Sequence, residues 1–251
     1  MSFVSISDIH VRNPKDERYS LLLHFMKHEV TKKSETIYFL GDIFDLMVGP
    51  HPEYLEMYSD FFNELVTLIK AGKKIHFFEG NHDLHIHRLF KKILKSHNLM
   101  DSSLIFHRHP WTQTIDGKVY YFSHGDELEP GNVSYKIYKK LLMSKPIEIL
   151  VSHVAPFSLI DAIGTKASEM SKKRGRRIYN EEKNRARFRS GAIKKASGIY
   201  DFIIAGHSHI SENIELKSQA KAFTYVNNGF LPEKKSFIAV DSNHIQFISL
   251  A

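Results

Sequence analysis

The sequence predicts an α/β protein built on a parallel sheet. Short apolar runs rich in β-branched and aromatic residues alternate with longer segments of helical periodicity, and polar motifs recur where these runs end. Size is a third observation, because 251 residues are enough for one large domain with a full core. We therefore expect a single domain over residues 1–251, with helices covering the faces of the sheet.

The first part of the chain repeats a strand–helix unit. Each expected strand is a short run of mostly apolar residues, and each expected helix places apolar residues three and four positions apart. A strand–helix–strand order in one sheet makes the strands parallel. The expected strands are 2–7, 36–40 and 74–78, and the expected helices are 19–30, 54–70 and 85–95.

The pattern changes in the second half of the chain. A hairpin is expected first, because Asp116-Gly117 favours a tight turn between two β-rich runs. A helical segment broken by Pro146 and Pro156 follows, and short strands close the chain. The hairpin strands are 111–115 and 118–122, the helical segment is 132–197, and the closing strands are 201–205, 212–216, 222–226, 236–240 and 244–249.

Basic residues are concentrated in one part of the chain. The net charge is +7, yet residues 165–195 alone hold twelve Lys and Arg against three Glu, so the rest of the chain is slightly acidic. We interpret residues 132–195 as a helical, basic insert in a sheet-rich body. Such a block favours an anionic partner, whether phosphate, nucleic acid or an acidic membrane surface, and a solvated helix face is the alternative.

Features that the sequence lacks narrow the function further. Without cysteine, the chain has no disulfide, thiolate zinc site, iron–sulfur cluster or cysteine nucleophile. Its first residues do not combine a basic region with a long apolar run, so no signal peptide is expected. The most apolar later stretch, 146–163, is interrupted by proline and charged residues and does not read as a membrane-spanning helix. We expect a cytoplasmic protein.

Five short polar motifs follow predicted strands. Ligands of open α/β sheets gather at the carboxyl ends of strands, so these motifs are expected to converge on one site. Each motif alone is of weak or moderate specificity, and their joint occurrence carries the prediction. They are Asp8-Ile9-His10, Gly41-Asp42-Ile43-Phe44-Asp45, Gly80-Asn81-His82-Asp83, Ser123-His124-Gly125-Asp126 and Gly206-His207-Ser208-His209.

The side chains of these motifs suit a pair of divalent metals. Carboxylate, amide and imidazole donors without sulfur are typical of manganese, iron or zinc sites, and a two-metal site needs one carboxylate that bridges the ions. We expect two divalent ions, manganese first, with iron or zinc as alternatives. The histidines outside every motif, His24, His28, His97 and His244, are interpreted as structural. The candidate ligands are Asp8, His10, Asp42, Asn81, His124, His207 and His209.

The ordered set Asp-x-His, Gly-Asp-x-x-Asp, Gly-Asn-His-Asp, His-Gly-Asp and Gly-His-x-His resembles the calcineurin-like metallophosphoesterase superfamily. The resemblance covers residues 8–209 and implies a four-layer α/β/β/α sandwich with a dimetal site at the strand ends. It also implies how the ligands divide. Asp8, His10, Asp42 and His209 would hold the first metal, and Asp42, Asn81, His124 and His207 the second, with Asp42 as the bridge.

The same resemblance implies two catalytic residues, His82 and its orienting partner Asp45. A water between two cations has a lowered pKa and becomes a hydroxide near neutral pH, which attacks phosphorus in line. His82 would stabilise the charge on the phosphoryl oxygens. The carboxylate of Asp45 would hold the imidazole in one tautomer and favour its charged form.

Within the superfamily, the chain most resembles the UDP-2,3-diacylglucosamine diphosphatases of lipid A synthesis. Its length, the stretch 41–49 and the basic helical insert between His124 and Gly206 carry this resemblance. It implies hydrolysis of UDP-2,3-diacylglucosamine to 2,3-diacylglucosamine 1-phosphate and UMP, with the insert as a lid over the acyl chains. Basic residues of the insert would contact the phosphate, and the candidates are Lys172, Lys173, Arg174 and Arg177.

Other functions stay open at this point. Apolar helix faces beside a basic cluster suit an anionic lipid and a peripheral place on the inner face of a membrane, but these faces could instead only dock the insert on the body. A phosphodiesterase or phosphatase for a soluble nucleotide or phosphoprotein, a nuclease and a scaffold without activity are the remaining alternatives. Because Tyr179 and Phe188 are the only aromatic residues of the basic segment, no nucleic-acid partner is expected.

Overall fold

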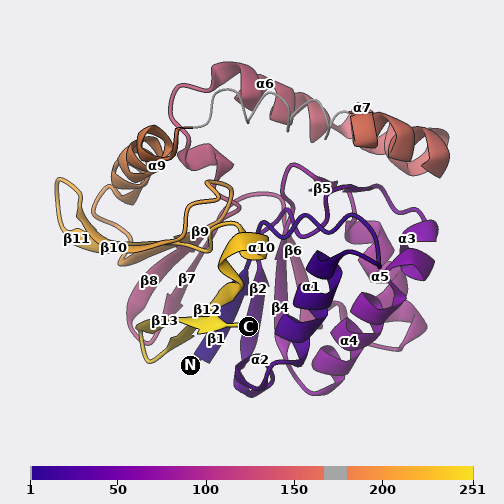
Figure 1. The fold of residues 1–251 in the computed structure, drawn as a ribbon, viewed down its shortest axis with the longest axis horizontal. Coiled ribbons are helices and arrows are strands. Elements are labelled where there is room, and N and C mark those ends of the chain that lie inside the picture. The colour runs from indigo at the N-terminus through magenta and orange to yellow at the C-terminus, as the bar shows by residue number, and fades with distance from the viewer. Residues whose placement is uncertain (1, 167–179, 251) are drawn as a thin grey trace.

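The computed structural model describes residues 2–166 and 180–250. In this part of the chain, the strands form a six-stranded sheet, a five-stranded sheet and a short two-stranded ladder (Figure 1). The prediction of a mixed α/β fold is confirmed. The four predicted phosphate contacts of the insert, Lys172, Lys173, Arg174 and Arg177, lie outside the described residues.

The six-stranded sheet contains the strands of the N-terminal half. β1 (Ser2–Ile6) pairs in parallel with β2 on one side and antiparallel with β12 on the other. β2, β4 and β6 are parallel, as the strand–helix alternation predicts, although the apolar pattern does not predict the edge strand β6. The order is β13 (His244–Ser249), β12 (Ser236–Asp241), β1, β2 (Thr36–Phe39), β4 (Lys74–Phe78) and β6 (Leu104–His107).

The five-stranded sheet begins with the predicted hairpin. Its two strands pair antiparallel from Trp111 opposite Phe122 to Ile115 opposite Lys118, which confirms the turn at Asp116-Gly117. β8, β9 and β11 are parallel. The order is β10 (Glu212–Lys217), β11 (Ala222–Asn227), β9 (Phe202–Ala205), β8 (Lys118–Phe122) and β7 (Trp111–Ile115), and the small ladder pairs β3 (Met47–Val48) with β5 (Asp83–Leu84).

Two helices that the periodicity predicts as continuous are each broken once, so the predictions over 19–30 and 54–70 are wrong in this respect. His28 has an extended backbone, and its Nδ1 accepts a hydrogen bond from Val30 N at 3.2 Å, which starts a new helix. Tyr58 breaks the other helix, and its hydroxyl donates to Arg12 O at 3.1 Å. The helices are α1 (Glu17–Lys27), α2 (Glu29–Lys33), α3 (Glu53–Met57), α4 (Ser59–Lys70), α5 (His87–Ser96) and α10 (Leu231–Lys234), with short turns η1 (Asp101–Ser103) and η2 (Asp126–Leu128).

Three apolar clusters hold these elements together. Because side chains alternate along a strand, Val4 faces α1, α4 and α5, while Phe3 faces the five-stranded sheet. The cluster between the two sheets is rich in aromatic rings, and Tyr38 stacks on Phe122 with ring centroids 4.1 Å apart. A third cluster packs Phe188 against the far face of the five-stranded sheet. The sheets therefore lie face to face, with helices on both outer sides (Figure 1).

The described part of the chain between β8 and β9 is mostly helical. It contains α6 (Val133–Leu142), α7 (Lys145–Ile149), η3 (Leu150–Val154), a helical stretch at 157–166 and α9 (Glu181–Ala196). α9 packs on the five-stranded sheet, whereas α6 and α7 run along the top of the view in Figure 1. No helix in the described ranges is long and apolar enough to cross a membrane.

Candidate metal centre

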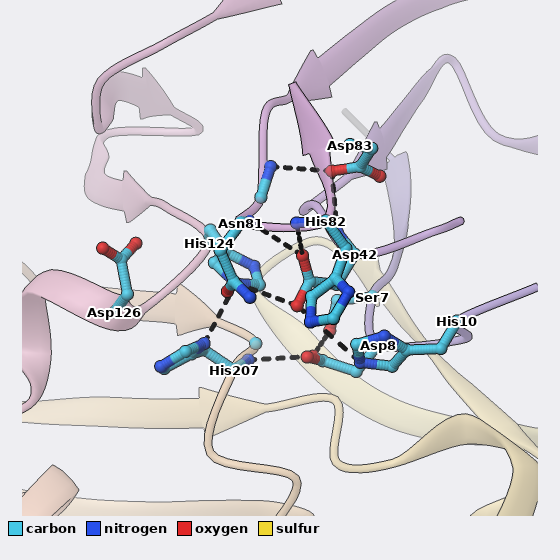
Figure 2. Close-up of polar contacts among 12 residues, drawn as sticks. Ser7, Asp8, His10, Asp42, Asn81, His82, Asp83, His124, Asp126 and His207 are labelled. Atoms are coloured by element: carbon cyan, nitrogen blue, oxygen red, sulfur yellow. Dashed lines mark hydrogen bonds and ion pairs between the residues drawn. The ribbon is translucent and has the colours of Figure 1, made fainter. Parts of the chain in front are cut away.

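All five predicted motifs meet at one place (Figure 2). Each follows the carboxyl end of a strand: Asp8 comes after β1, Asp42 after β2, Asn81 after β4, His124 after β8 and His207 after β9. These strands are parallel within their sheets, so their ends open on the same side. The loops after them converge as the strand-end argument predicts.

The first group of ligands gathers around Asp8. The Nε2 atoms of His10 and His209 lie 3.4 Å apart, and His209 Nε2 lies 3.4 Å from Asp8 Oδ1. Asp42 Oδ2 is 3.7 Å from His10 Nε2. Atoms bound to one ion at about 2.0–2.2 Å lie about 3–3.7 Å from each other, so this spacing fits a shared cation.

The second group gathers around His124. Its Nε2 lies 3.1 Å from Asn81 Oδ1, 3.1 Å from His207 Nδ1 and 3.5 Å from Asp42 Oδ2. His124 Nδ1 donates to the carbonyl oxygen of Leu40 at 2.9 Å, which places the proton there and leaves the Nε2 lone pair for a metal. The ring is therefore already oriented as a ligand.

Asp42 lies between the two groups and uses its two oxygens differently. Oδ1 accepts the backbone N–H of Asn81 at 2.8 Å and of His82 at 3.0 Å. Oδ2 is left facing both His10 and His124. A carboxylate held through one oxygen with the other between two ligand groups has the arrangement that a bridging ligand needs.

Two buried polar atoms test whether this site fits cations. Asp8 Oδ2 accepts the backbone N–H of His207 and the hydroxyl of Ser7, but Asp8 Oδ1 accepts no hydrogen bond from any described residue. His10 Nδ1 also has no hydrogen-bond partner among the described residues, but it faces the carboxylate of Asp45 at 3.5 Å, while His10 Nε2 faces the ligand group. Because a buried carboxylate oxygen without a donor costs free energy, a metal ion is the partner that this donor set fits.

The backbone of the site is strained in a way that sequence reasoning missed. Asp8, His10, Asp42, His207 and His209 all have positive φ values between 53° and 65°, a region that residues other than glycine rarely adopt. Such strain costs on the order of 1–3 kcal/mol per residue and is concentrated at functional sites. The loops therefore place their ligands before any ion arrives.

Two glycines allow the loops to approach closely. A Cβ on Gly80 would lie 2.2 Å from Asp42 Oδ1, and a Cβ on Gly206 would lie 2.4 Å from Ser7 Oγ. Neither distance can be relieved easily, because both oxygens are held by hydrogen bonds within the centre. The glycines that open the third and fifth motifs are therefore required by packing.

The structure brings His82 and Asp45 together, mainly through the backbone. His82 Nδ1 donates to the carbonyl oxygen of Asp45 at 2.8 Å, whereas the Asp45 carboxylate is 3.8 Å away. That carboxylate lies closer to His10 Nδ1, at 3.5 Å, and to Arg12 Nε, at 3.1 Å. His10, Asp45 and His82 also form a third group whose atoms lie within 4.8 Å of one another.

The surroundings of Asp42 and His207 shift their pKa values in the directions that metal binding needs, whereas nearby carboxylates outweigh burial and raise the pKa values of His124 and His209. Burial by itself raises the pKa of Asp42, but four surrounding imidazoles outweigh burial and hold that pKa well below the usual range. Burial lowers the pKa of His207 to about 3, so this imidazole is neutral and its lone pair is available at neutral pH. Ligands that are already deprotonated bind cations without releasing protons.

Asp83 is a positioning residue that the sequence analysis assigned no role. Its carboxylate accepts the backbone N–H of Asp42 at 3.1 Å, of Ile43 at 2.8 Å and of Gly80 at 2.8 Å. Burial and the charge of Asp42 raise the pKa of Asp83 to about 7. Asp83 ties two metal-binding loops together, and its place as the last residue of Gly-Asn-His-Asp was the available signal.

The comparisons with known proteins agree with this geometry. The family model described as calcineurin-like phosphoesterase matches residues 1–211. The UDP-2,3-diacylglucosamine hydrolase of Hamiltonella defensa subsp. Acyrthosiphon pisum (strain 5AT) is 29% identical over 224 residues, which are 86% of this chain and 81% of that protein. The protein of the same name from Histophilus somni (strain 2336) is 25% identical over 245 residues, 97% of both chains.

A solved structure with lower sequence identity has a similar fold. A novel archaeal phosphodiesterase matches with a TM-score of 0.50 and 13% identity, over 99% of both chains. The matched family model spans every motif of the centre, from Asp8 to His209. The chain belongs to the calcineurin-like phosphoesterase family and is a hydrolase with buried His and Asp clusters for divalent metals.

Proposed function

We propose that the chain hydrolyses the diphosphate of a nucleotide-linked lipid, most specifically UDP-2,3-diacylglucosamine, to 2,3-diacylglucosamine 1-phosphate and UMP. One observation carries the choice of a lipid: a row of exposed apolar side chains on the helical segment between β8 and β9. The names of the relatives support the choice of nucleotide and sugar. We further propose that the two sheets and their outer helices form the four-layer sandwich that the sequence resemblance implies.

The exposed apolar row is unusual for the surface of a water-soluble body. Nine large apolar side chains between residues 133 and 163 are 45–67% exposed. So many exposed apolar side chains within one short segment favour a place that covers a ligand, a partner or a membrane. The residues are Val133, Ile137, Tyr138, Leu141, Ile149, Leu150, Val154, Leu159 and Ile163.

α6, α7 and η3 are attached to the body mainly by polar contacts, so the exposed apolar side chains of these elements are not used in docking. Glu148 of α7 is buried and accepts a hydrogen bond from Arg108 at 3.0 Å. His85 Nε2 donates to Leu142 O at 2.8 Å, and His51 Nε2 donates to Val151 O at 2.9 Å. Apolar contacts come later in the segment, where Phe157 packs on Tyr54, Ile160 is buried and Phe188 of α9 packs on the five-stranded sheet. The polar contacts favour the lid interpretation over a docking role for the exposed apolar residues.

The residues of the centre divide the hydrolysis among them. When bound, two divalent ions supply a hydroxide from water and neutralise phosphoryl charge. Asp42 and the imidazoles would hold the two ions in fixed positions. Their loops are joined by the hydrogen bonds of Asp83 and by the backbone hydrogen bond to Asp42. His82 lies beside the ligand groups with Nδ1 held by Asp45 O, which leaves Nε2 to meet charge on a phosphoryl oxygen. Water and the diphosphate give two phosphate monoesters.

The remaining parts of the proposal concern the surroundings of the protein. We propose manganese as the first choice of metal, with iron or zinc as alternatives. Lys172, Lys173, Arg174 and Arg177 are proposed to contact the substrate phosphate or an anionic membrane surface. The protein would act in the cytoplasm, peripherally on the inner face of the membrane, where its lipid substrate lies.

The experiment is hydrolysis of UDP-2,3-diacylglucosamine by the full chain with manganese, measured as UMP and lipid phosphate released in equal amounts. We expect two metal ions per chain, about 3.5–4 Å apart. Asp42→Asn should abolish both activity and the second ion, while Asp60→Asn, an exposed aspartate on α4, should change neither. Cleavage of a soluble nucleotide diester without cleavage of the lipid would favour the soluble phosphodiesterase instead.

A further inference from the structure

A pocket of about 260 Å³ opens beside the metal centre, and nothing in the proposed roles above uses it. We call it the Arg12 pocket. One wall comes from the loop after β1 and from α3, and the other wall comes from residues 161–165 of the helical segment. Its lining includes Arg12, Asn13, Tyr54, Tyr58, Asp161 and Thr165.

Arg12 is held in place at the mouth of this pocket. Its Nε lies 3.1 Å from Asp45 Oδ2, and the other oxygen of Asp45 lies 3.5 Å from His10 Nδ1. One carboxylate therefore separates the guanidinium from the first ligand group. The side chain is 48% exposed, and its two terminal nitrogens contact no other charged or hydrogen-bonding group among the described residues.

A guanidinium in this position is preorganised to bind a phosphate. Its planar fork matches two phosphate oxygens, and Asp45 already restricts its rotamers, so less entropy is lost on binding. The backbone next to it is also fixed, because Tyr58 donates its hydroxyl to Arg12 O at 3.1 Å. The next phosphate of a diphosphate whose neighbour lies at the metals would fall within reach of Arg12.

The pocket itself suits a nucleoside better than acyl chains. Its volume is below the roughly 300–1,000 Å³ of pockets that enclose drug-sized ligands, which fits one ring system and not two acyl chains. Its lining combines the buried rings of Tyr54 and Tyr58 and the apolar side chains of Leu46 and Met57 with the charged groups of Arg12 and Asp161. Acyl chains here would remove water from the exposed Arg12 and Asp161 without giving either of them a hydrogen bond. Hydroxyls and ring N–H groups of a nucleoside would instead be paired.

We infer that the Arg12 pocket binds the nucleoside 5′-phosphate end of the substrate, with Arg12 on its phosphate and Asp161 on its ribose or base. This rests on the proposed function, because it assigns the two ends of the same substrate. The acyl end then lies on the exposed apolar row and the nucleoside end on the opposite side of residues 161–165.

The test compares Arg12→Gln with Lys15→Gln, which removes an exposed cation from the same loop outside the pocket. Binding of UMP to the manganese-loaded full chain is measured by calorimetry and by product inhibition. Arg12→Gln should weaken UMP at least tenfold and raise KM for the nucleotide lipid similarly, while Lys15→Gln changes both less than twofold. Arg12→Lys should recover part of the affinity. Turnover of bis(4-nitrophenyl) phosphate, which has no nucleoside, should fall less in Arg12→Gln than turnover of the nucleotide lipid, and it should be unchanged in Lys15→Gln.

A second variant fills the pocket and leaves Arg12 intact. Thr165→Trp should weaken UMP at least tenfold but leave inhibition by inorganic phosphate unchanged, and Lys166→Trp, on an exposed neighbour, should leave both unchanged. UMP affinity within twofold of wild type in both Arg12→Gln and Thr165→Trp overturns the inference. Equal loss on the lipid and on the small diester in Arg12→Gln also overturns it, because Arg12 then acts on the metal centre.

The two proposals fail separately. If UDP-2,3-diacylglucosamine is not cleaved but UMP binding depends on Arg12 and on the open pocket, the substrate assignment falls and the nucleotide site stands. If the lipid is cleaved and UMP binds equally well to Arg12→Gln, Thr165→Trp and the wild type, the proposed function stands and the nucleotide site is wrong. If Thr165→Trp changes KM for the nucleotide lipid in a way that depends on acyl-chain length but leaves UMP affinity unchanged, the acyl end and not the nucleoside lies in the pocket.

Discussion

At the residue scale, the proposed function assigns the binding of ions and the contact with substrate to different side chains of the centre. Backbone groups hold Asp42 Oδ1 and His124 Nδ1. The other atoms of these side chains, Asp42 Oδ2 and His124 Nε2, therefore face the space between the two ligand groups. His82 takes part in this frame through its backbone N–H to Asp42, whereas its ring is held by Asp45 O. Metal occupancy and turnover should therefore depend on different side chains.

His82→Ala tests that separation. It removes the ring but keeps the N–H that Asp42 accepts, so both ions should remain while kcat falls by on the order of 10²–10⁴, the usual contribution of a group that stabilises charge or transfers a proton. Metal content by mass spectrometry is measured beside kcat, and His244→Ala on exposed β13 serves as the control. Loss of one ion together with activity would instead make His82 a ligand, in the group that it forms with His10 and Asp45.

At the element scale, the sequence predicted strands and their polar ends well because both depend on neighbouring residues. Apolar runs place the strands, and motif residues directly after them place the ligands. The break at Tyr58 could not be predicted, because the hydrogen bond that its hydroxyl makes there goes to Arg12 in a distant loop. The positive φ values of Asp8 and Asp42 could not be predicted either, since these loops are held by hydrogen bonds to other loops and local propensity does not favour such φ values.

The attachment of α7 is the clearest long-range feature, and it gives a pH prediction. Burial raises the pKa of Glu148, but Arg108 and Lys145 outweigh burial and lower it to about 2 from 4.5. A depressed carboxyl pKa stabilises the folded form above about pH 4.5, and this contribution is lost as the pH falls toward 2. Docking of α7 should therefore weaken by on the order of 2–3 kcal/mol across that window.

Amide hydrogen exchange within α7 measures this opening. In Glu148→Gln, exchange should already be faster at pH 7 and should lose its acid dependence between pH 4.5 and 2, because no charge remains to be titrated. Glu56→Gln, on an exposed glutamate of α3, should behave like the wild type. An unchanged acid profile in Glu148→Gln would show that another group controls the docking of α7.

A second prediction at this scale concerns the packing of α9. Helix propensity alone favours Gly191→Ala by about 1 kcal/mol. In this fold, however, a Cβ at position 191 would lie 1.7 Å from Leu128 O, so α9 or η2 must move. The free energy of unfolding should fall by about 1–3 kcal/mol, as in other overpacked sites. Denaturant unfolding measures it, with Ser190→Ala as the control, and a gain in stability would contradict the packing at Leu128.

At the scale of the whole molecule, charge and apolar surface are distributed together. Residues 165–195 hold a net charge of +9, while the remaining chain is slightly acidic, and the exposed apolar row directly precedes this basic segment. In the proposed function, an anionic membrane would attract the basic segment, and the apolar side chains would then enter its surface. The metal centre and the Arg12 pocket would remain on the water side, where a nucleotide can enter and leave.

This arrangement predicts binding to vesicles that contain anionic lipid. Ile137→Ser combined with Leu141→Ser removes two exposed side chains of α6, each worth about 1.5–3 kcal/mol when fully buried. Sedimentation with vesicles should show at least tenfold weaker binding, while hydrolysis of a small diester stays unchanged. Ile199→Ser, which changes an exposed apolar residue outside the apolar row of residues 133–163, is the control. Added salt should weaken the wild type through screening of its basic residues, and equal vesicle binding by the double variant would show that charge alone brings the protein to the membrane.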